Sequence, residues 1–417
     1  MLIAYFFPPE ITSAAFRAYS FFKYLPLYGW DPYVLTVAVK NKTKGPQAEI
    51  PDRGRIFHSF EIETKRHLSL FGRFPLFLAF PDNHIGWLPF AFFKSVRIIR
   101  RRKIRLIFST SYPWTSSLVG LLLKKTLKLP WVTEFRDPWI NLFLEGKKKN
   151  RIVDYLNYKL EKMVVENADG VIVTTAQSKE YYLKRFPRID GNKITVIYNG
   201  FDADDLKPLK NIACNKEKFT ICYAGLLQEG EYRDPKFFLR ALSELKKERK
   251  IGKELSLIFI GCGKYVERAK FKALIDDAGL EENLQIIGSV EHNVVFDYFS
   301  AADVLLLLQQ ESCYNDCVPV KAFEYLALGK PIICLTSFDA ETAALVKKYS
   351  PQSLVIDYRD NREIKKGIME FYAKWQDNVL VAHVDPEFMR LFARKRQTSE
   401  LAEAFGSVLF RKAAGFN

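Results

Sequence analysis

The stretch ESCYNDCVPVKAFEYLALGKPII at residues 311–333 contains charged side chains whose types and spacing suit a phosphate and a pair of hydroxyl groups. Lys321 and Glu324 are three positions apart, so on a helix they lie on one face, and Asp316 precedes them in a polar loop. A lysine can bind a phosphate oxygen, and the two oxygens of a carboxylate can accept hydrogen bonds from two hydroxyls. The spacing is equally compatible with an internal Lys–Glu pair at the rim of a core.

The elements around these side chains predict a position at the edge of a parallel sheet. The apolar run ADVLLLL at 302–308 predicts a buried strand, and PIICL, which begins at Pro331, predicts another. Between them, Val318 and Pro319 stand where a helix begins, and Gly329 stands where it ends. Such a unit puts its loop at the carboxyl edge of the sheet, where open α/β sheets bind ligands and a helix N-terminus favours phosphate.

Length and composition narrow the class of protein. The chain has 417 residues, 48% of them hydrophobic, so two domains with large cores are expected. A net charge of +15 indicates a polyanionic partner such as an anionic membrane surface or a phosphorylated substrate, whereas no recognisable motif indicates nucleic acid. No run reaches the ~18 apolar residues of a spanning helix, and the N-terminus lacks the features of a signal peptide. The six cysteines fit no zinc motif and are expected to be free thiols in a reducing cytosol.

Apolar strands alternate with helical patterns along most of the chain, which predicts an α/β fold of two doubly wound domains. The polar, patternless segment at 201–218 marks their junction. We therefore predict an N-terminal domain at 1–205, a C-terminal domain at 206–385 and a C-terminal helix at 386–417. Two such domains leave a cleft between their carboxyl edges, which suits a reaction with two substrates.

Four motifs follow one another along the chain: YFFPPEITSAAFRAYSFFKYLPLYGWDPYVLT, TSYPWTSSLVGLLLKKTLKLPWVTEFRDPW, VIYNGFDADDL and VPVKAFEYLALGKPII. Together they resemble the retaining glycosyltransferases of family 4, which have the GT-B architecture, and the resemblance covers nearly the whole chain. It implies a Rossmann-like N-terminal domain that binds the acceptor and a Rossmann-like C-terminal domain that binds a nucleotide-sugar donor. It also implies a C-terminal helix that packs back onto the first domain.

The resemblance assigns roles to charged residues of the C-terminal domain. It places Glu324 on the donor ribose hydroxyls and Lys321 on the diphosphate. Asp316 stands in place of the glutamate that family members use to contact the donor sugar. The family also carries a Gly-Arg pair after the first strand of this domain. This chain has a leucine in place of that arginine, and Arg233 or Lys236 can substitute for it.

Small residues mark further candidate contacts of the donor. Gly261 and Gly263 follow a strand in GCGKY, where they either bring the backbone close to a nucleotide or only turn the chain. The segment IIGSV at 286–290 resembles the family segment whose backbone edges the base. Gly288 and Val290 are therefore candidate contacts as well.

Two segments of the first domain add candidate residues. PPEITSAA occupies the place of the family's glycine-rich loop near the donor phosphates, and its small residues Ser13 and Ala14 leave room for a close approach. EFRDPW places Arg136 and Asp137 at a strand end, where the arginine can hold an anionic group and the aspartate an acceptor hydroxyl. A salt bridge between the two, with Asp137 capping a helix, is an equally good interpretation.

The resemblance implies a metal-independent, retaining glycosyltransferase. It would transfer a hexosyl or related group from a nucleotide-diphosphate sugar to a saccharide or lipid-linked acceptor in cell-surface polysaccharide or glycolipid synthesis. No cofactor or metal is expected, so the charge on the leaving diphosphate must be met by Lys321, nearby basic groups and the helix N-terminus. Two alternatives stay open: a sugar-nucleotide epimerase of the same architecture, and a non-catalytic relative that binds a membrane or polysaccharide.

A membrane partner is suggested by KSVRIIRRRKIR at 94–105, which has seven basic residues and no acidic one. LSLFGRFPLFLAFPDNHIGWLPF at 68–90 adds aromatic side chains that we expect to be exposed in a loop. A basic helix flanked by aromatics suits an anionic lipid surface, so we predict peripheral attachment to the cytoplasmic face of the cell membrane. The alternative is a basic helix that covers the sheet, with the aromatics packed in the core.

Overall fold

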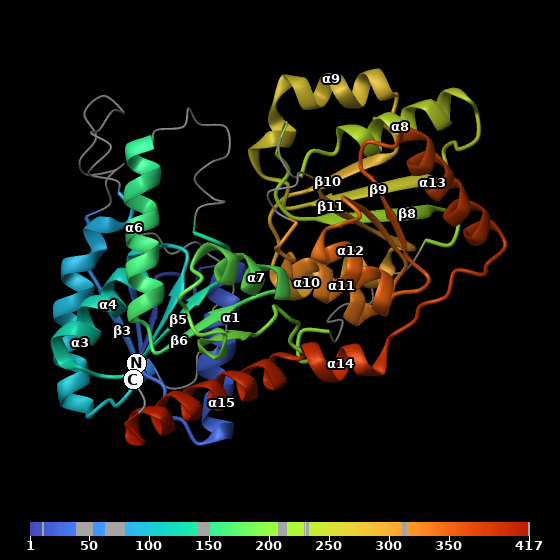
Figure 1. Cartoon of the computed structure of the whole chain (residues 1–417). Coiled ribbons are helices and arrows are strands. Elements are labelled where there is room, and N and C mark those ends of the chain that lie inside the picture. The colour runs from blue at the N-terminus through green and yellow to red at the C-terminus, as the bar shows by residue number, and fades with distance from the viewer. Residues whose placement is uncertain are drawn as a thin grey trace. The chain divides into compact units, whose positions relative to one another are not determined.

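The computed structural model describes residues 1–10, 12–38, 53–62, 80–139, 151–206, 215–228, 230, 233–310 and 315–415. The chain forms two compact units (Figure 1). Unit 1 comprises Met1–Tyr198 and Arg394–Asn417, and unit 2 comprises Asn199–Ala393. The chain therefore changes unit a few residues away from the boundaries at 205 and 385 that the sequence suggested.

Hydrogen bonds show why the chain passes from unit 1 to unit 2 after Tyr198. Arg17 donates to the carbonyl oxygens of Ile197 and Tyr198 at 2.9 and 2.7 Å, which holds this segment in unit 1. A few residues later, Phe201 N donates to the carbonyl oxygen of Phe392 at 3.2 Å within unit 2. The segment that marked the junction, 201–218, begins with one of these anchoring residues, and its polar composition begins at Asp202.

Unit 1 is built on a parallel sheet. Its strands are β1 (Leu2–Ala4), β2 (Val34–Val37), β3 (Ile56–Ser59), β4 (Ile107–Ser111), β5 (Trp131–Phe135), β6 (Gly170–Val173) and β7 (Ile194–Val196). Its helices are α1 (Ser13–Tyr24), α3 (Leu88–Arg102), α4 (Thr115–Leu127), α6 (Arg151–Asn167), α7 (Ala176–Arg185) and α15 (Arg394–Ala413). In the described residues the strand order is β3-β2-β1-β4-β5-β6-β7, so the order reverses between β1 and β4. Ligands of doubly wound sheets bind beyond the carboxyl ends of the strands at such a point.

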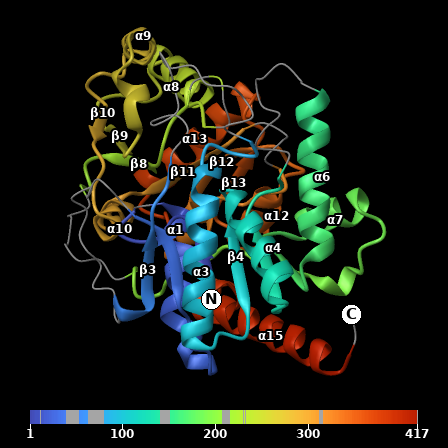
Figure 2. The ribbon, with the colours of Figure 1, turned by 90° about the vertical axis from the view of Figure 1, so that its left-hand side faces the viewer.

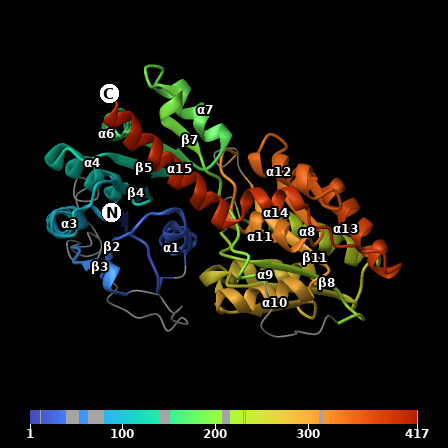
Figure 3. The same cartoon turned by 90° about the horizontal axis from the view of Figure 1, so that it is seen from below.

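Helices cover both faces of this sheet. On one face α3 and α4 bury apolar side chains such as Ile99 and Val119 against it (Figure 2). On the other face lie α1 and α15 (Figure 3). They meet over Phe108 of β4, whose ring centroid lies 5.9 Å from that of Phe21 and 5.3 Å from that of Phe405. The end of the chain therefore supplies part of the core of unit 1.

Unit 2 repeats this architecture. Its strands are β8 (Phe219–Ala224), β9 (Leu255–Ile260), β10 (Leu284–Ile287), β11 (Val304–Gln309), β12 (Ile332–Thr336) and β13 (Leu354–Ile356). Its helices are α8 (Lys236–Lys247), α9 (Ala269–Ala278), α10 (His292–Ala301), α11 (Val320–Leu328), α12 (Glu341–Tyr349), α13 (Asn361–Gln376) and α14 (Pro386–Phe392). The described strands run parallel in the order β10-β9-β8-β11-β12-β13, with α8, α9 and α13 on one face and α10, α11 and α12 on the other (Figure 1). The predicted fold class of two Rossmann-like α/β domains is confirmed.

The segment predicted as one C-terminal helix at 386–417 is divided between the units. Its first part, α14, packs in unit 2, where the rings of Phe388 and Phe323 are stacked with centroids 6.3 Å apart. Ala393 then adopts an extended conformation, which ends α14 before α15 begins in unit 1. Phe323 is a core residue of unit 2.

The aromatic segment at 68–90 lies partly outside the described residues, which exclude 68–79. In the described part, the expectation of exposed aromatics is wrong for Trp87. Its side chain is fully buried, and its Nε1 donates to Ser59 Oγ at 2.6 Å. Among the described residues nearby, Phe60 and Phe93 are the exposed aromatic side chains, at 47% and 71%.

Candidate functional site

Helix α11 begins where the sequence predicts. Pro319 is its N-cap residue, with an extended backbone. The loop before it is held by two bonds to backbone carbonyls: Gln309 Nε2 donates to Cys317 O at 2.8 Å, and Asn199 Nδ2 donates to Val318 O at 3.2 Å. These two bonds fix the backbone of Cys317 and Val318 directly before the N-cap residue of α11.

Lys321 lies in the first turn of α11 and carries a buried amine. Its Nζ atom has no hydrogen-bond partner among the residues that the structure describes, and it lies 4.1 Å from the ring centroid of Tyr223. Burial lowers the pKa of Lys321 well below its usual value, and the positive charge of Arg233 lowers it further, whereas the nearby Glu324 raises it. An anion bound beside Nζ would supply the counter-charge that this amine lacks.

The backbone beside Lys321 needs a glycine. Gly225 follows β8 with a φ of +127°, which is accessible to glycine and strained for other residues. A Cβ atom at this position would lie only 2.9 Å from Lys321 Nζ. A side chain at residue 225 would therefore displace the lysine.

Glu324 is held by a histidine that the sequence analysis did not single out. Glu324 Oε1 lies 3.0 Å from His292 Nε2, and His292 Nδ1 lies 3.7 Å from Asp205 Oδ2. His292 begins α10 and follows the segment that contains Gly288, which is exposed, and Val290, which is half-buried. The candidate base-edging segment and the candidate ribose carboxylate are thus linked through His292. The only sequence signal was a histidine placed directly after that segment.

The glycines of GCGKY lie in the same network of loops. Gly261 and Gly263 have φ values of +63° and +70°, and Gly261 N donates to Ile287 O at 3.0 Å. A Cβ at Gly263 would lie 2.8 Å from Leu226 Cδ2, which places the loop after β9 against the loop after β8. These loops lie at the carboxyl ends of strands adjacent to the reversal of strand order between β8 and β11.

The remaining candidates of unit 2 differ in their surroundings. Arg233 is half-buried and close enough to Lys321 to lower its pKa. Lys236 instead pairs with Asp234, at 3.6 Å from Nζ to Oδ2. Asp316 is half-buried and accepts a hydrogen bond from Cys317 Sγ at 3.6 Å. Of the two proposed substitutes for the missing arginine, Arg233 is the one whose charge acts on Lys321, and its role, like that of Asp316, stays a prediction.

Four of the candidates lie in unit 1. Ser13 and Ala14 form the first turn of α1, which Thr12 caps by accepting a hydrogen bond from Ala15 N at 3.1 Å. Ser13 is exposed and Ala14 is buried. Both lie in the segment that follows β1, at the carboxyl edge of the sheet. Their assignment to donor phosphates stays a prediction.

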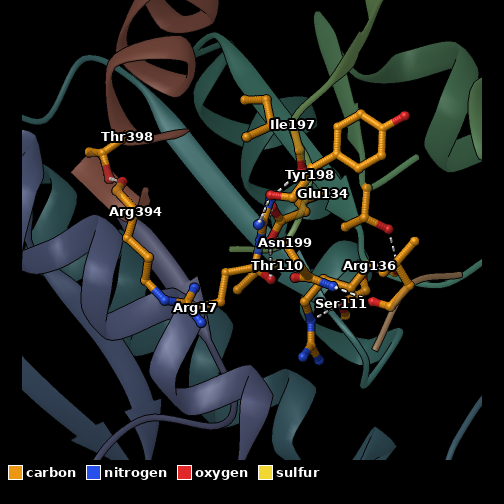
Figure 4. Close-up of polar contacts among 12 residues, drawn as sticks. Arg17, Thr110, Ser111, Glu134, Arg136, Ile197, Tyr198, Asn199, Arg394 and Thr398 are labelled. Carbon is orange, nitrogen blue, oxygen red and sulfur yellow. Dashed lines mark hydrogen bonds and ion pairs between the residues drawn. The ribbon is translucent and has the colours of Figure 1, made fainter. Parts of the chain in front are cut away.

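Arg136 fastens the loop that follows β4. Its Nε donates to Ser111 O at 2.7 Å and its Nη2 to Tyr112 O at 3.0 Å (Figure 4). Burial lowers the pKa of Arg136, and the charges of Asp137 and Glu134 oppose that effect. Among the described residues, Arg136 and Asp137 form no ion pair, although the charge of Asp137 acts on Arg136. The capping of a helix by Asp137 falls on residues 140–150, which lie outside the described residues. Binding of an anionic group by Arg136 stays a prediction.

A buried ion pair beside Arg136 was not anticipated from the sequence. Arg17 Nη2 lies 2.8 Å from Glu134 Oε1, with exposures of 1% and 0%, and Thr110 Oγ1 donates to Glu134 Oε2 at 2.6 Å (Figure 4). Because Arg17 also holds the carbonyls of Ile197 and Tyr198, it joins α1, β5 and the segment after β7. No local pattern reveals a pair whose members are so far apart in the chain.

Both halves of the chain match models of protein families. Residues 17–205 match Glycosyltransferase Family 4, and residues 218–374 match Glycosyl transferases group 1. Between them the two matches cover most of unit 1 and most of unit 2.

The curated relatives are distant in sequence. The D-inositol 3-phosphate glycosyltransferase of Corynebacterium jeikeium is 23% identical over 241 residues, which cover 54% of this chain and 54% of the relative. The capsular polysaccharide biosynthesis glycosyltransferase CapH of Staphylococcus aureus is 24% identical over 242 residues, which cover 55% of this chain and 62% of that protein. The chain spans about half the length of the curated relatives it matches.

Among solved structures, Anabaena HepE in complex with UDP-glucose has a similar fold. Its TM-score is 0.67 at 16% identity, with 97% of this chain and 99% of HepE covered. At this identity the similarity shows the GT-B fold alone. The predicted GT-B architecture is confirmed by this similarity together with the two parallel sheets.

Proposed function

Because the chain belongs to the family 4-like glycosyltransferases, we propose that it transfers a sugar from a nucleotide-diphosphate donor to a saccharide or lipid-linked acceptor. Unit 2 binds the donor, the transfer retains the anomeric configuration, and no metal takes part. The products serve the synthesis of a polysaccharide or glycolipid, a role supported by the name of the Staphylococcus aureus relative.

One observation carries this proposal: the buried Lys321 amine, which has no hydrogen-bond partner among the described residues, at the N-terminus of α11. A diphosphate there would receive the lysine charge, the charge of Arg233 and the partial positive charge of the helix N-terminus. These groups replace the metal that other enzymes use to neutralise a leaving diphosphate.

A uridine nucleotide is the first donor to test, because the similar HepE structure is a complex with UDP-glucose. In this proposal Glu324 accepts hydrogen bonds from the ribose hydroxyls, and Gly288 and Val290 edge the base. His292 holds Glu324 in place before the nucleotide arrives, through the 3.0 Å contact to Oε1. Arg233 takes the role of the arginine that family members carry after the first strand of this domain.

In the transfer step, the bond between the anomeric carbon and the diphosphate oxygen breaks while the acceptor oxygen bonds to the same face of that carbon. The leaving phosphate takes the acceptor proton. Negative charge grows on the phosphate as the bond breaks, so Lys321 binds the transition state more strongly than the ground state, which is the condition for catalysis.

The donor proposal is tested by thermal shift with a panel of UDP, GDP, ADP and dTDP sugars. A bound donor should raise the Tm of the wild type, because a ligand of the native state stabilises it. Transfer to an acceptor is then followed in buffer with EDTA, where activity is expected to persist. If no nucleotide sugar shifts the Tm, the donor site is refuted. If a donor is converted to its epimer without an acceptor, the epimerase alternative is correct.

Membrane attachment is supported by the surface of α3. A hollow of about 680 Å³ between α3 and β3 is lined by basic and apolar side chains. They are Phe57, Phe93, Lys94, Arg97, Ile98, Arg101 and Arg102. Within the described part of the chain, no helix combines the length and the apolar composition needed to cross a membrane. We propose that α3 binds the phosphate groups of anionic lipids with its arginines, while Phe93 enters the apolar layer.

Liposome co-sedimentation tests this attachment. The wild type is expected to bind vesicles that contain phosphatidylglycerol and to bind phosphatidylcholine vesicles weakly. The double variant Arg97→Glu/Arg101→Glu should lose that preference, whereas exchanging two exposed basic residues of unit 2, Lys247 and Arg249, for Glu should not. If both variants sediment equally with phosphatidylglycerol vesicles, α3 does not bind the membrane.

A further inference from the structure

A second group of polar side chains lies in unit 1, at the carboxyl edge of the sheet near the reversal between β1 and β4. We call it the His84 cluster, and it consists of Tyr5, Glu10, Glu61, Asp82, His84 and Tyr112. Tyr5 follows β1 and Tyr112 follows β4, so the cluster occupies the position where doubly wound sheets bind ligands. It contains none of the residues predicted from the sequence.

The imidazole of His84 is fixed in orientation. Its Nδ1 lies 2.8 Å from Glu61 Oε1, and Tyr5 Oη donates to Glu61 Oε2 at 2.5 Å. The backbone N of His84 donates to Asp82 Oδ1 at 2.9 Å, and Asp82 in turn accepts two hydrogen bonds from Thr115. A carboxylate at Nδ1 holds the proton on that nitrogen and leaves Nε2 as the group that faces a ligand.

Two hydrogen-bonding groups of the cluster are unused. Among the residues that the structure describes, His84 Nε2 has no partner, and the side chain of His84 is 17% exposed. Glu10 Oε2 is buried and also has no partner within the described residues. Burial raises the pKa of Glu10, the charge of His84 lowers it and the charge of Glu61 raises it, so the three groups are neighbours.

Aromatic rings surround the imidazole. The ring centroid of His84 lies 4.3 Å from that of Tyr5, 6.3 Å from that of Tyr112 and 6.4 Å from that of Phe6. Phe6 and Tyr112 are half-buried, so each retains some accessible ring surface. Aromatic surface next to carboxylate and imidazole groups suits a sugar ring, which has apolar C–H faces and hydroxyls at its edge.

The charge of the cluster decides which ligand it suits. Glu10, Glu61 and Asp82 are all acidic, so the cluster repels a phosphate or diphosphate, in contrast to the surroundings of Lys321. A neutral sugar is a better partner, because one of its hydroxyls can donate to Glu10 Oε2 and another can form a hydrogen bond with His84 Nε2. From this geometry we propose that the His84 cluster is the subsite of unit 1 for a neutral saccharide of the acceptor. This proposal rests on the proposed function and adds the chemical class of the acceptor and the residues that bind it.

Direct binding to an array of neutral oligosaccharides tests the proposal without transfer. The wild type is expected to bind at least one glycan, and His84→Ala and Glu10→Gln should each weaken that binding about 10-fold or more, as loss of a buried hydrogen bond to a substrate hydroxyl does. Glu61→Gln should weaken it less, because Glu61 acts through His84. His58→Ala is the matched control, since His58 is an exposed histidine of the same unit whose Nδ1 lies 3.4 Å from Val37 O.

The same variants separate this proposal from the donor proposal. The rise in Tm caused by UDP should be unchanged in His84→Ala and Glu10→Gln, because neither residue belongs to unit 2. Absence of glycan binding by the wild type, or equal binding by both variants, overturns the subsite. If UDP does not raise the Tm of the wild type, the donor site is refuted. The glycan-binding result still decides the subsite in that case. Because Glu10→Gln removes only a charge, it keeps the test valid if His84→Ala does not fold.

Discussion

Replacing Lys321 with Met separates a ligand-binding lysine from a structural one. The variant keeps an unbranched side chain as far as the ε position and removes the ammonium. If Lys321 stabilises the charge on a leaving diphosphate, kcat should fall about 10²–10³-fold, which corresponds to ~2.7–4 kcal/mol of transition-state stabilisation. The rise in Tm on adding UDP should disappear as well. Lys247→Met, at an exposed lysine near the end of α8, is the control that should change neither.

The Tm of the ligand-free protein should not fall when Lys321 is replaced with Met, although kcat does. Nζ of Lys321 is buried and has no hydrogen-bond partner among the described residues, so Met at this position should leave the Tm unchanged or raise it. A structural lysine would instead lower the Tm when it is removed. A Tm lowered by several degrees together with near-normal turnover would therefore refute our interpretation of this residue.

The pH dependence gives an independent check on the same residue. The pKa of Lys321 is lowered in the folded state, so between that pKa and the ordinary lysine pKa the unfolded chain binds a proton that the native chain does not. The free energy of unfolding contributed by this residue therefore rises with pH in that window, by at most about 1.4 kcal/mol per pH unit. Below the folded pKa this contribution is fully lost. Tm measured from pH 7 to 10 should rise more steeply for the wild type than for Lys321→Met, and equal slopes would contradict the argument.

Three further variants test other contacts. Gly225→Ala should abolish the UDP response, because its Cβ would lie 2.9 Å from Lys321 Nζ. Gly230→Ala, also at positive φ but with no atom within 4 Å, should keep the response and separates backbone strain from steric displacement. His292→Ala should weaken UDP binding several-fold in titration calorimetry by releasing Glu324, and an unchanged Kd would show that the histidine does not position it. Arg17→Met should lower the free energy of unfolding by about 3–5 kcal/mol, because it leaves Glu134 buried and unpaired. Adding Glu134→Gln should recover part of that loss in denaturant titration, and a double variant no more stable than Arg17→Met would contradict this explanation.

The strands of the sheets were largely predictable, and the exceptions have a physical cause. Buried parallel strands read as continuous apolar runs, so LLLL in β11 and VIV in β6 are unambiguous. β3 is hard to predict, because its sequence, IFHS, is short, contains an exposed histidine and forms the edge of the sheet. Exposure of Trp87 was mispredicted, because burial of its ring depends on a partner, Ser59, from a different part of the chain.

The candidate site was predictable where it depends on local spacing. The three-residue separation of Lys321 and Glu324 and the caps of α11 follow from neighbouring residues. The burial of the Lys321 amine depends on Tyr223 and Gly225. These residues are distant in sequence and come close to Lys321 because β8 and β11 are neighbours in the parallel sheet. His292 could not be identified for the same reason, because its contact with Glu324 joins two helices that are separate in sequence.

The contribution of α15 to the core of unit 1 affects the order in which a ribosome can complete the two units. Phe405 packs against Phe108 and Trp30, and Leu401 is fully buried in the same cluster. A nascent chain that has emerged as far as Ala393 contains all of unit 2 but still lacks this helix. Unit 2 can therefore fold first, although its sequence begins later. Unit 1 must keep an apolar surface uncovered throughout that interval, and a chaperone could bind it there.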